Sequence, residues 1–218
     1  MKKLCIFDLD GTLSDTLPTI AYYGNLALQK YGHQPIEEQR YKILVGNGRD
    51  LLIHRMLAES NSDTPAEFER VGAAYDAAYE ADALYLTKPY NGISELLENL
   101  KKNGIKTAVL SNKPHNVACA VVKELFGGIF DAVWGKKPEF PVKPNPCAAL
   151  NICRGLCAEP KDAVFIGDTR VDIETGKNGG FYTIGVLWGF RTKEELQAAG
   201  ADFIASQPGE IFDVILRN

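Results

Sequence analysis

Two aspartates, Asp8 and Asp10, follow a short apolar run near the amino terminus and are separated by one residue. The apolar residues 4–7 are typical of a central parallel strand that is buried on both faces, and Gly11 ends that strand. At the carboxyl end of such a strand, alternation directs both aspartate side chains toward the crevice where open α/β sheets bind ligands. Because adjacent carboxylates repel each other, the pair implies a shared proton or a hard cation such as Mg²⁺.

The run DLDGTL at 8–13 resembles motif I of the haloacid dehalogenase (HAD) superfamily of phosphotransferases. The resemblance implies that Asp8 is the nucleophile, which forms an aspartyl-phosphate, and that Asp10 is the general acid and base. It also implies that Gly11 and Thr12 contact the phosphate. A carboxylate needs a divalent cation to approach a phosphate dianion, which agrees with a metal at this position. The alternative is that the two aspartates cap a turn.

The run SNKP at 111–114 resembles motif II of the same superfamily and follows a predicted strand at 107–111. The resemblance implies that Ser111 holds a phosphoryl oxygen, and Asn112 at the entrance to the next helix offers further donors to an anion. The alternative is that Ser111 or Asn112 caps that helix, with proline near its first position.

The run KPNP at 143–146 resembles motif III, which implies that Lys143 neutralises both the nucleophile and the transferring phosphate. An ammonium group suits this role because it is a compact point charge. Lys136 and Lys137 lie close in sequence, and only the resemblance distinguishes Lys143 from them.

The run VFIGDTRVD at 164–172 again carries an apolar strand that ends in an acidic residue. The resemblance implies that Asp168 is a Mg²⁺ ligand together with Asp8 and the backbone carbonyl of Asp10. Asp172, one helical turn further on, is expected either to orient a metal-bound water or to brace Lys143. The alternative for Asp172 is a carboxylate that stabilises the amino end of a helix.

The resemblance covers essentially the whole chain. The segments 89–92, 178–180 and 188–191 resemble the phosphoglycolate phosphatase-like branch of the superfamily. That branch carries a helical cap between motifs I and II. GNGR at 46–49 resembles the substrate-specificity loop of its cap, where the Arg49 guanidinium could clamp a carboxylate in bidentate fashion. The alternative is a solvent-facing arginine at a helix start. A dinucleotide fingerprint is rejected because Leu51 replaces its third glycine.

The motifs together imply a Mg²⁺-dependent phosphatase that hydrolyses a small, phosphoglycolate-like phosphorylated metabolite through an aspartyl-phosphate. One alternative is an isomerase of the β-phosphoglucomutase type, which uses the same four motifs. Another is a phospho-accepting regulatory module, although such a module needs neither the second aspartate nor a cap. Dehalogenase and phosphonatase activities are disfavoured because those relatives lack the aspartate that Asp10 supplies here.

Helices and strands alternate after residue 89, which predicts parallel βαβ units. The expected fold is α/β, with a Rossmann-like three-layer core around a central parallel sheet, formed by residues 1–14 and 87–218. Further strands are predicted at 132–134, 163–167, 182–187 and 203–205. Residues 15–86 are predicted to form an inserted small helical cap domain, with helices over 17–31, 49–57 and 65–79.

The composition is that of an ordinary globular chain: 218 residues, 45% hydrophobic, with a net charge of -4. This charge disfavours a broad nucleic-acid footprint, and no apolar segment is long enough for a membrane span or signal peptide. Five cysteines without a C-x-x-C pair indicate reduced thiols. We therefore expect a cytoplasmic protein that binds a small phosphorylated substrate and no nucleic acid or membrane, as a monomer or weak homodimer.

Overall fold

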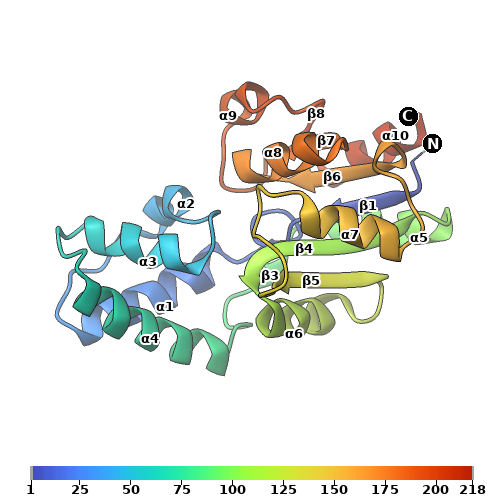
Figure 1. The fold of residues 1–218 in the computed structure, drawn as a ribbon. Coiled ribbons are helices and arrows are strands. Elements are labelled where there is room, and N and C mark those ends of the chain that lie inside the picture. The colour runs from blue at the N-terminus through green and yellow to red at the C-terminus, as the bar shows by residue number, and fades with distance from the viewer. Residues whose placement is uncertain (1, 218) are drawn as a thin grey trace. The chain divides into compact units, whose positions relative to one another are not determined.

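The computed structural model describes residues 2–217 and divides into two compact units (Figure 1). One unit contains the chain up to Asp15 and from Pro89 onward, and the other is Thr16–Lys88. The short strands β2 (Ser14–Asp15) and β3 (Lys88–Pro89) pair with each other at the two places where the chain passes between the units. The first unit holds the predicted α/β core, and the second is the predicted helical insert.

The core is built on a six-stranded parallel sheet with the order β5-β4-β1-β6-β7-β8. Its strands are β1 (Leu4–Phe7), β4 (Lys106–Pro114), β5 (Ala132–Lys136), β6 (Ala163–Gly167), β7 (Tyr182–Val186) and β8 (Phe203–Ala205). Strand β1 pairs with β4 on one side and β6 on the other, and all four of its residues are fully buried. Burial on both faces explains its continuous apolar sequence and confirms the predicted fold class.

Helices cover the sheet in the alternating order that the sequence predicts (Figure 1). They are α5 (Ile93–Lys102), α6 (His115–Phe126), α7 (Cys147–Gly155), α8 (Arg170–Gly179), α9 (Lys193–Ala198) and α10 (Pro208–Arg217), with a 3₁₀ turn at Pro160–Asp162. One buried cluster joins Leu4, Ile6 and Phe165 of the strands to Ile152 of α7. Because strand side chains alternate between faces, Cys5 and Phe7 belong to the opposite face of the sheet, which is also buried.

The second unit is entirely helical. It contains α1 (Leu17–Lys30), a 3₁₀ turn at Glu38–Arg40, α2 (Tyr41–Leu44), α3 (Arg49–Ala58) and α4 (Pro65–Ala81). Its core includes Tyr41, Ile53 and Met56, which are fully buried. The hydroxyl oxygen of Thr64 accepts a hydrogen bond from the Glu67 N–H at 3.3 Å and caps the start of α4. Across residues 2–217, every helix is too short or too polar to span a bilayer.

Candidate active site

The predicted site residues lie at the carboxyl ends of three neighbouring strands. Asp8 directly follows β1, Ser111 lies near the end of β4, and Asp168 directly follows β6. Because β1 lies between β4 and β6 in a parallel sheet, these ends meet at one edge. After β1, the chain first adds β4 and β5 on one side of it, and then adds β6, β7 and β8 on the other side. Such a switch point is where open α/β sheets bind ligands.

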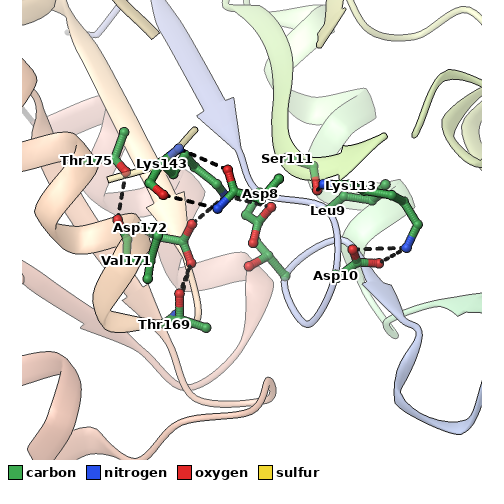
Figure 2. A network of polar contacts seen from close by, with 12 residues as sticks. Asp8, Leu9, Asp10, Ser111, Lys113, Lys143, Thr169, Val171, Asp172 and Thr175 are labelled. Atoms are coloured by element: carbon green, nitrogen blue, oxygen red, sulfur yellow. Dashed lines mark hydrogen bonds and ion pairs between the residues drawn. The ribbon is translucent and has the colours of Figure 1, made fainter. Parts of the chain in front are cut away.

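A buried ammonium group joins two carboxylates at the centre of this edge. The Nζ of Lys143 lies 2.8 Å from Asp8 Oδ1 and 2.6 Å from Asp172 Oδ1, and all three residues are buried (Figure 2). Lys136 and Lys137 lie at the end of β5 and beyond it, and the Lys137 Nζ lies 4.0 Å from the Trp134 ring centroid. The sequence leaves three lysines as candidates for neutralising the nucleophile, and Lys143 is the one that contacts Asp8.

Asp172 serves two partners at once. Its Oδ2 accepts hydrogen bonds from the Thr169 N–H at 3.0 Å and the Thr169 hydroxyl at 2.7 Å, which closes a capping box at the start of α8. Its Oδ1 faces Lys143. Asp172 thus contacts Lys143 through one carboxylate oxygen and caps α8 through the other, while the orientation of a metal-bound water stays a prediction.

Asp168 is held by two donors from distant parts of the chain. Its Oδ1 accepts from the Thr12 hydroxyl at 2.9 Å, and its Oδ2 accepts from the Phe190 N–H at 2.9 Å. The indole N–H of Trp188 donates to the carbonyl of Thr12 at 2.9 Å, so the segment after β7 is tied to motif I as well. Gly11 adopts φ +85°, and a Cβ there would lie 2.3 Å from Asp168 Oδ2, so only glycine fits at this turn.

The buried carboxylates lie close enough to perturb one another. Burial, reinforced by the charge of Asp172, raises the pKa of Asp8 to about 7 although Lys143 opposes the shift. Burial also raises the pKa of Asp168 well above its usual range, with Asp172 and Asp8 adding to the effect. Burial alone would lower the pKa of Lys143, but Asp172 and Asp8 outweigh it and raise that pKa, so the ammonium stays charged.

The donor set fits a divalent cation. Oxygens of Asp8, Asp168 and Asp172 lie within 4.8 Å of one another, and all three residues are buried. One ammonium offsets one of the three negative charges, which leaves two for a bound cation to neutralise. Hard carboxylate oxygens are the ligands that Mg²⁺ and similar ions prefer. The cluster is consistent with a divalent metal site in which Asp8 and Asp168 hold the ion, while Asp172 is engaged by Lys143 and Thr169.

The Asp10 side chain takes a different direction from that of Asp8. Lys113 Nζ lies 2.8 Å from its Oδ1 and 3.0 Å from its Oδ2. Figure 2 shows this pair pointing toward each other, apart from the group formed by Asp8, Lys143 and Asp172. The Asp10 carboxylate is accordingly not part of the acidic cluster found among residues 2–217. The predicted metal ligand at this position is the backbone carbonyl, and that assignment stays a prediction.

Ser111 and Asn112 do not cap the helix that follows them. Helix α6 begins at His115, its N-cap is Pro114, and no side chain caps it. The Ser111 hydroxyl oxygen accepts from the Lys113 N–H at 3.2 Å. Asn112 exchanges two hydrogen bonds with the backbone of Lys143, accepting at 2.9 Å and donating at 3.2 Å. The capping alternative is therefore wrong, and Asn112 instead ties the Lys143 main chain to β4.

Arg49 lies in the helical unit and is fully engaged there. Its Nε and Nη2 donate to the two oxygens of Asp76 at 2.9 and 2.7 Å, its Nη1 lies 3.2 Å from Asp50 Oδ1, and its guanidinium lies over the Phe68 ring at 5.3 Å. The alternative of a solvent-facing side chain does not hold, because only 21% of the Arg49 side chain is exposed. The carboxylate that Arg49 holds in bidentate fashion in this structure is that of Asp76, in the same helical unit.

Sequence reasoning gave no role to Lys113 or Phe190. Lys113 lies within motif II, but its partner Asp10 is 103 residues away. Phe190 contributes a main-chain N–H, which carries no residue signature. The available signal was indirect, namely the unusual run WGFR at 188–191 directly after a predicted strand.

The chain resembles proteins named as phosphatases along nearly its full length. A phosphoglycolate phosphatase from Vibrio parahaemolyticus is 31% identical over 227 residues, covering 98% of this chain and 96% of the relative. An N-acetylmuramic acid 6-phosphate phosphatase from Pseudomonas aeruginosa is 33% identical over 218 residues, covering 99% and 95%. A crystal structure from Lactobacillus delbrueckii subsp. bulgaricus, provisionally named phosphoglycolate phosphatase, superposes with a TM-score of 0.95 at 31% identity and 99% coverage of both chains.

The family itself is shown by a sequence profile. Residues 5–186 match the profile of the haloacid dehalogenase-like hydrolases. This match includes all four motifs, from the aspartate pair after β1 to the acidic residues around the start of α8. The chain belongs to the haloacid dehalogenase-like hydrolase family.

Proposed function

We propose that this protein is a Mg²⁺-dependent phosphomonoesterase that hydrolyses a small, carboxylate-bearing phosphate ester through an aspartyl-phosphate. The observation that carries the proposal is the contact of Asp8 with the buried Lys143 ammonium, beside two further buried carboxylates. A nucleophilic carboxylate needs positive charge around it to approach a phosphate dianion, and this arrangement supplies one cation and the ligands for another.

In the first step, a carboxylate oxygen of Asp8 attacks phosphorus and the bond from phosphorus to the ester oxygen breaks. Asp10 gives its proton to that departing oxygen, so the alcohol leaves neutral and Asp10 becomes a carboxylate. Lys143 stabilises the charge that is shared between the nucleophile and the transferring group. Ser111 and the main chain around Asn112 offer donors to the phosphoryl oxygens.

In the second step, water attacks phosphorus and the bond from phosphorus to Asp8 breaks. Asp10 takes one proton from that water, so that Asp8 returns as a carboxylate, Asp10 as an acid, and the product is hydrogen phosphate. Each proton that Asp10 gives is thereby regained within one cycle. When bound, Mg²⁺ supplies the charge neutralisation that lets an ionised Asp8 meet a phosphate dianion.

Two relatives of similar identity to this chain are named for different substrates. We therefore base the proposal on the chemical groups that the two substrates share. Phosphoglycolate and N-acetylmuramic acid 6-phosphate are both phosphomonoesters whose organic part carries a carboxylate. An arginine in the helical unit would suit such a group, provided that Arg49 exchanges its bond to Asp76 for the substrate.

Phosphate release from three esters tests the proposal. We expect release from phosphoglycolate or N-acetylmuramic acid 6-phosphate to exceed release from glucose 6-phosphate, which lacks a carboxylate. Activity should vanish in EDTA, return with Mg²⁺, and be inhibited by Ca²⁺, whose looser coordination misplaces the nucleophile. Asp8→Asn is the matched inactive control. Full turnover after prolonged chelation, or conversion of a sugar phosphate into an isomer without phosphate release, would contradict the proposal.

A further inference from the structure

We infer that Lys113 is a positioning residue for Asp10, an inference that rests on the proposed function. Its ammonium bridges both oxygens of the Asp10 carboxylate, at 2.8 and 3.0 Å. The two side chains are 7% and 20% exposed, so little water competes for the contact. The pair joins the end of β4 to the turn after β1.

The surrounding backbone delivers Lys113 to this place. Ser111 and Lys113 are two residues apart in the last part of β4. The pairing of β4 with β5 shifts register between Leu110 and Pro114, and the strand continues past the phosphate-binding serine as far as Pro114. The Lys113 N–H also donates to the Ser111 hydroxyl at 3.2 Å. One residue thus contacts two groups of the proposed site.

The main chain around Asp10 is fixed, but its carboxylate is oriented by Lys113. Asp10 forms a bridge with Ser14, and the Gly11 N–H donates to the Ser14 carbonyl at 2.9 Å. These bonds set the Cα of Asp10 and leave its two side-chain torsions undetermined. A general acid and base must lie within hydrogen-bond reach of the departing oxygen and of the attacking water. Misplacement by about 1 Å costs about 100-fold in rate.

Rapid-quench kinetics with p-nitrophenyl phosphate separate the two steps that Asp10 serves. Nitrophenolate leaves without a proton, so Lys113→Met should phosphorylate Asp8 at nearly the wild-type rate. Hydrolysis of the aspartyl-phosphate needs Asp10 as a base, and we expect it to slow by about 10–100-fold. The variant should therefore show a stoichiometric burst of nitrophenolate and accumulate phosphoenzyme visible by mass spectrometry. Lys113→Arg should recover most of the loss, because a guanidinium also bridges two carboxylate oxygens.

Lys106→Met is the matched control, since it removes an exposed lysine from the other end of β4. It should behave as wild type. A crystal structure of Lys113→Met should also show the Asp10 side chain in more than one rotamer.

Three results would overturn the inference. A raised KM without phosphoenzyme accumulation would make Lys113 a substrate ligand. Equal loss in both steps together with a lower melting temperature would make it merely structural, and unchanged kinetics would remove it from the site. Wild-type protein that forms no phosphoenzyme and releases no phosphate would defeat the proposed function as well, so the two failures are distinguishable.

Discussion

Gly189→Ala is expected to damage the metal site although it replaces no charged residue. A Cβ at position 189 would lie 2.3 Å from Asp168 Cβ and 2.4 Å from the Gly11 carbonyl oxygen. Nonbonded carbon atoms pack at roughly 3.5–4.0 Å, so the main chain must move by more than about 1 Å. Neither neighbour can rotate away, because one atom is a Cβ and the other belongs to the backbone.

The expected magnitude follows from two losses. Overpacking a filled site costs about 1–3 kcal/mol of unfolding free energy. Moving residue 189 also pulls the Phe190 N–H from Asp168 Oδ2, which it contacts at 2.9 Å. A hydrogen bond to a charged group contributes about 1.5–3 kcal/mol. Together these give an expected loss of about 2.5–6 kcal/mol, or roughly 5–24 °C in melting temperature. Mg²⁺ affinity should fall by about 10–100-fold, because the second donor to a ligand is lost.

Thermal melting with and without Mg²⁺, together with calorimetric titration of the ion, measures both effects. Gly155→Ala is the matched control, because the space around Gly155 at the end of α7 is open and alanine favours the helix. It should melt at the wild-type temperature or slightly above. A Gly189→Ala protein that melts like wild type and binds Mg²⁺ with unchanged affinity would refute the packing argument.

Three other predictions concern the acidic residues and the helical unit. Asp8→Asn should form no phosphoenzyme, whereas Asp10→Asn should still be phosphorylated by p-nitrophenyl phosphate and then lose the phosphate slowly. Mass spectrometry of quenched samples distinguishes the two variants. Normal phosphoenzyme in Asp8→Asn would exclude Asp8 as the nucleophile. Because burial raises the pKa of Asp8 to about 7, the folded metal-free protein binds more protons than the unfolded chain between about pH 4 and 7. Its stability should fall as pH rises through that window; urea denaturation in EDTA tests this, and stability that rises with pH would contradict it. Arg49→Ala should raise the KM for a carboxylate-bearing substrate by about 10–100-fold and leave the KM for p-nitrophenyl phosphate unchanged. Asp76→Asn breaks the same internal pair but should leave both KM values unchanged. Equal effects in the two variants would assign Arg49 to stability alone.

The sequence predicted most of the core because its strands are apolar and end in chemically distinctive residues. Strands β6 and β8 have the predicted bounds, and β1 follows from four apolar residues before Asp8. Strand β4 runs to Pro114, three residues beyond its predicted end, since polar residues after Ser111 carry no strand signal. The 3₁₀ turn and α2 in the helical unit were too short for periodicity to reveal.

Side-chain direction was the part that the sequence could not supply. Asp10 and Asp8 are two residues apart, but β1 ends at Phe7, so strand alternation does not govern the turn that follows. Asp10 takes its direction from Lys113, and Arg49 takes its direction from Asp76, 27 residues on. Such pairings depend on tertiary packing, because the local sequence around each partner does not distinguish it from the other charged residues of the chain.

The pairing of β2 with β3 bears on how the chain folds. Leu4 of β1 pairs with Lys106 of β4, so this central contact closes a loop of about 100 residues. If Thr16–Lys88 has already formed and its ends are joined, the loop that remains is about a quarter as long. Two halvings of loop length save about 1 kcal/mol of closure entropy, which favours a route in which the helical unit forms early and the sheet assembles afterwards.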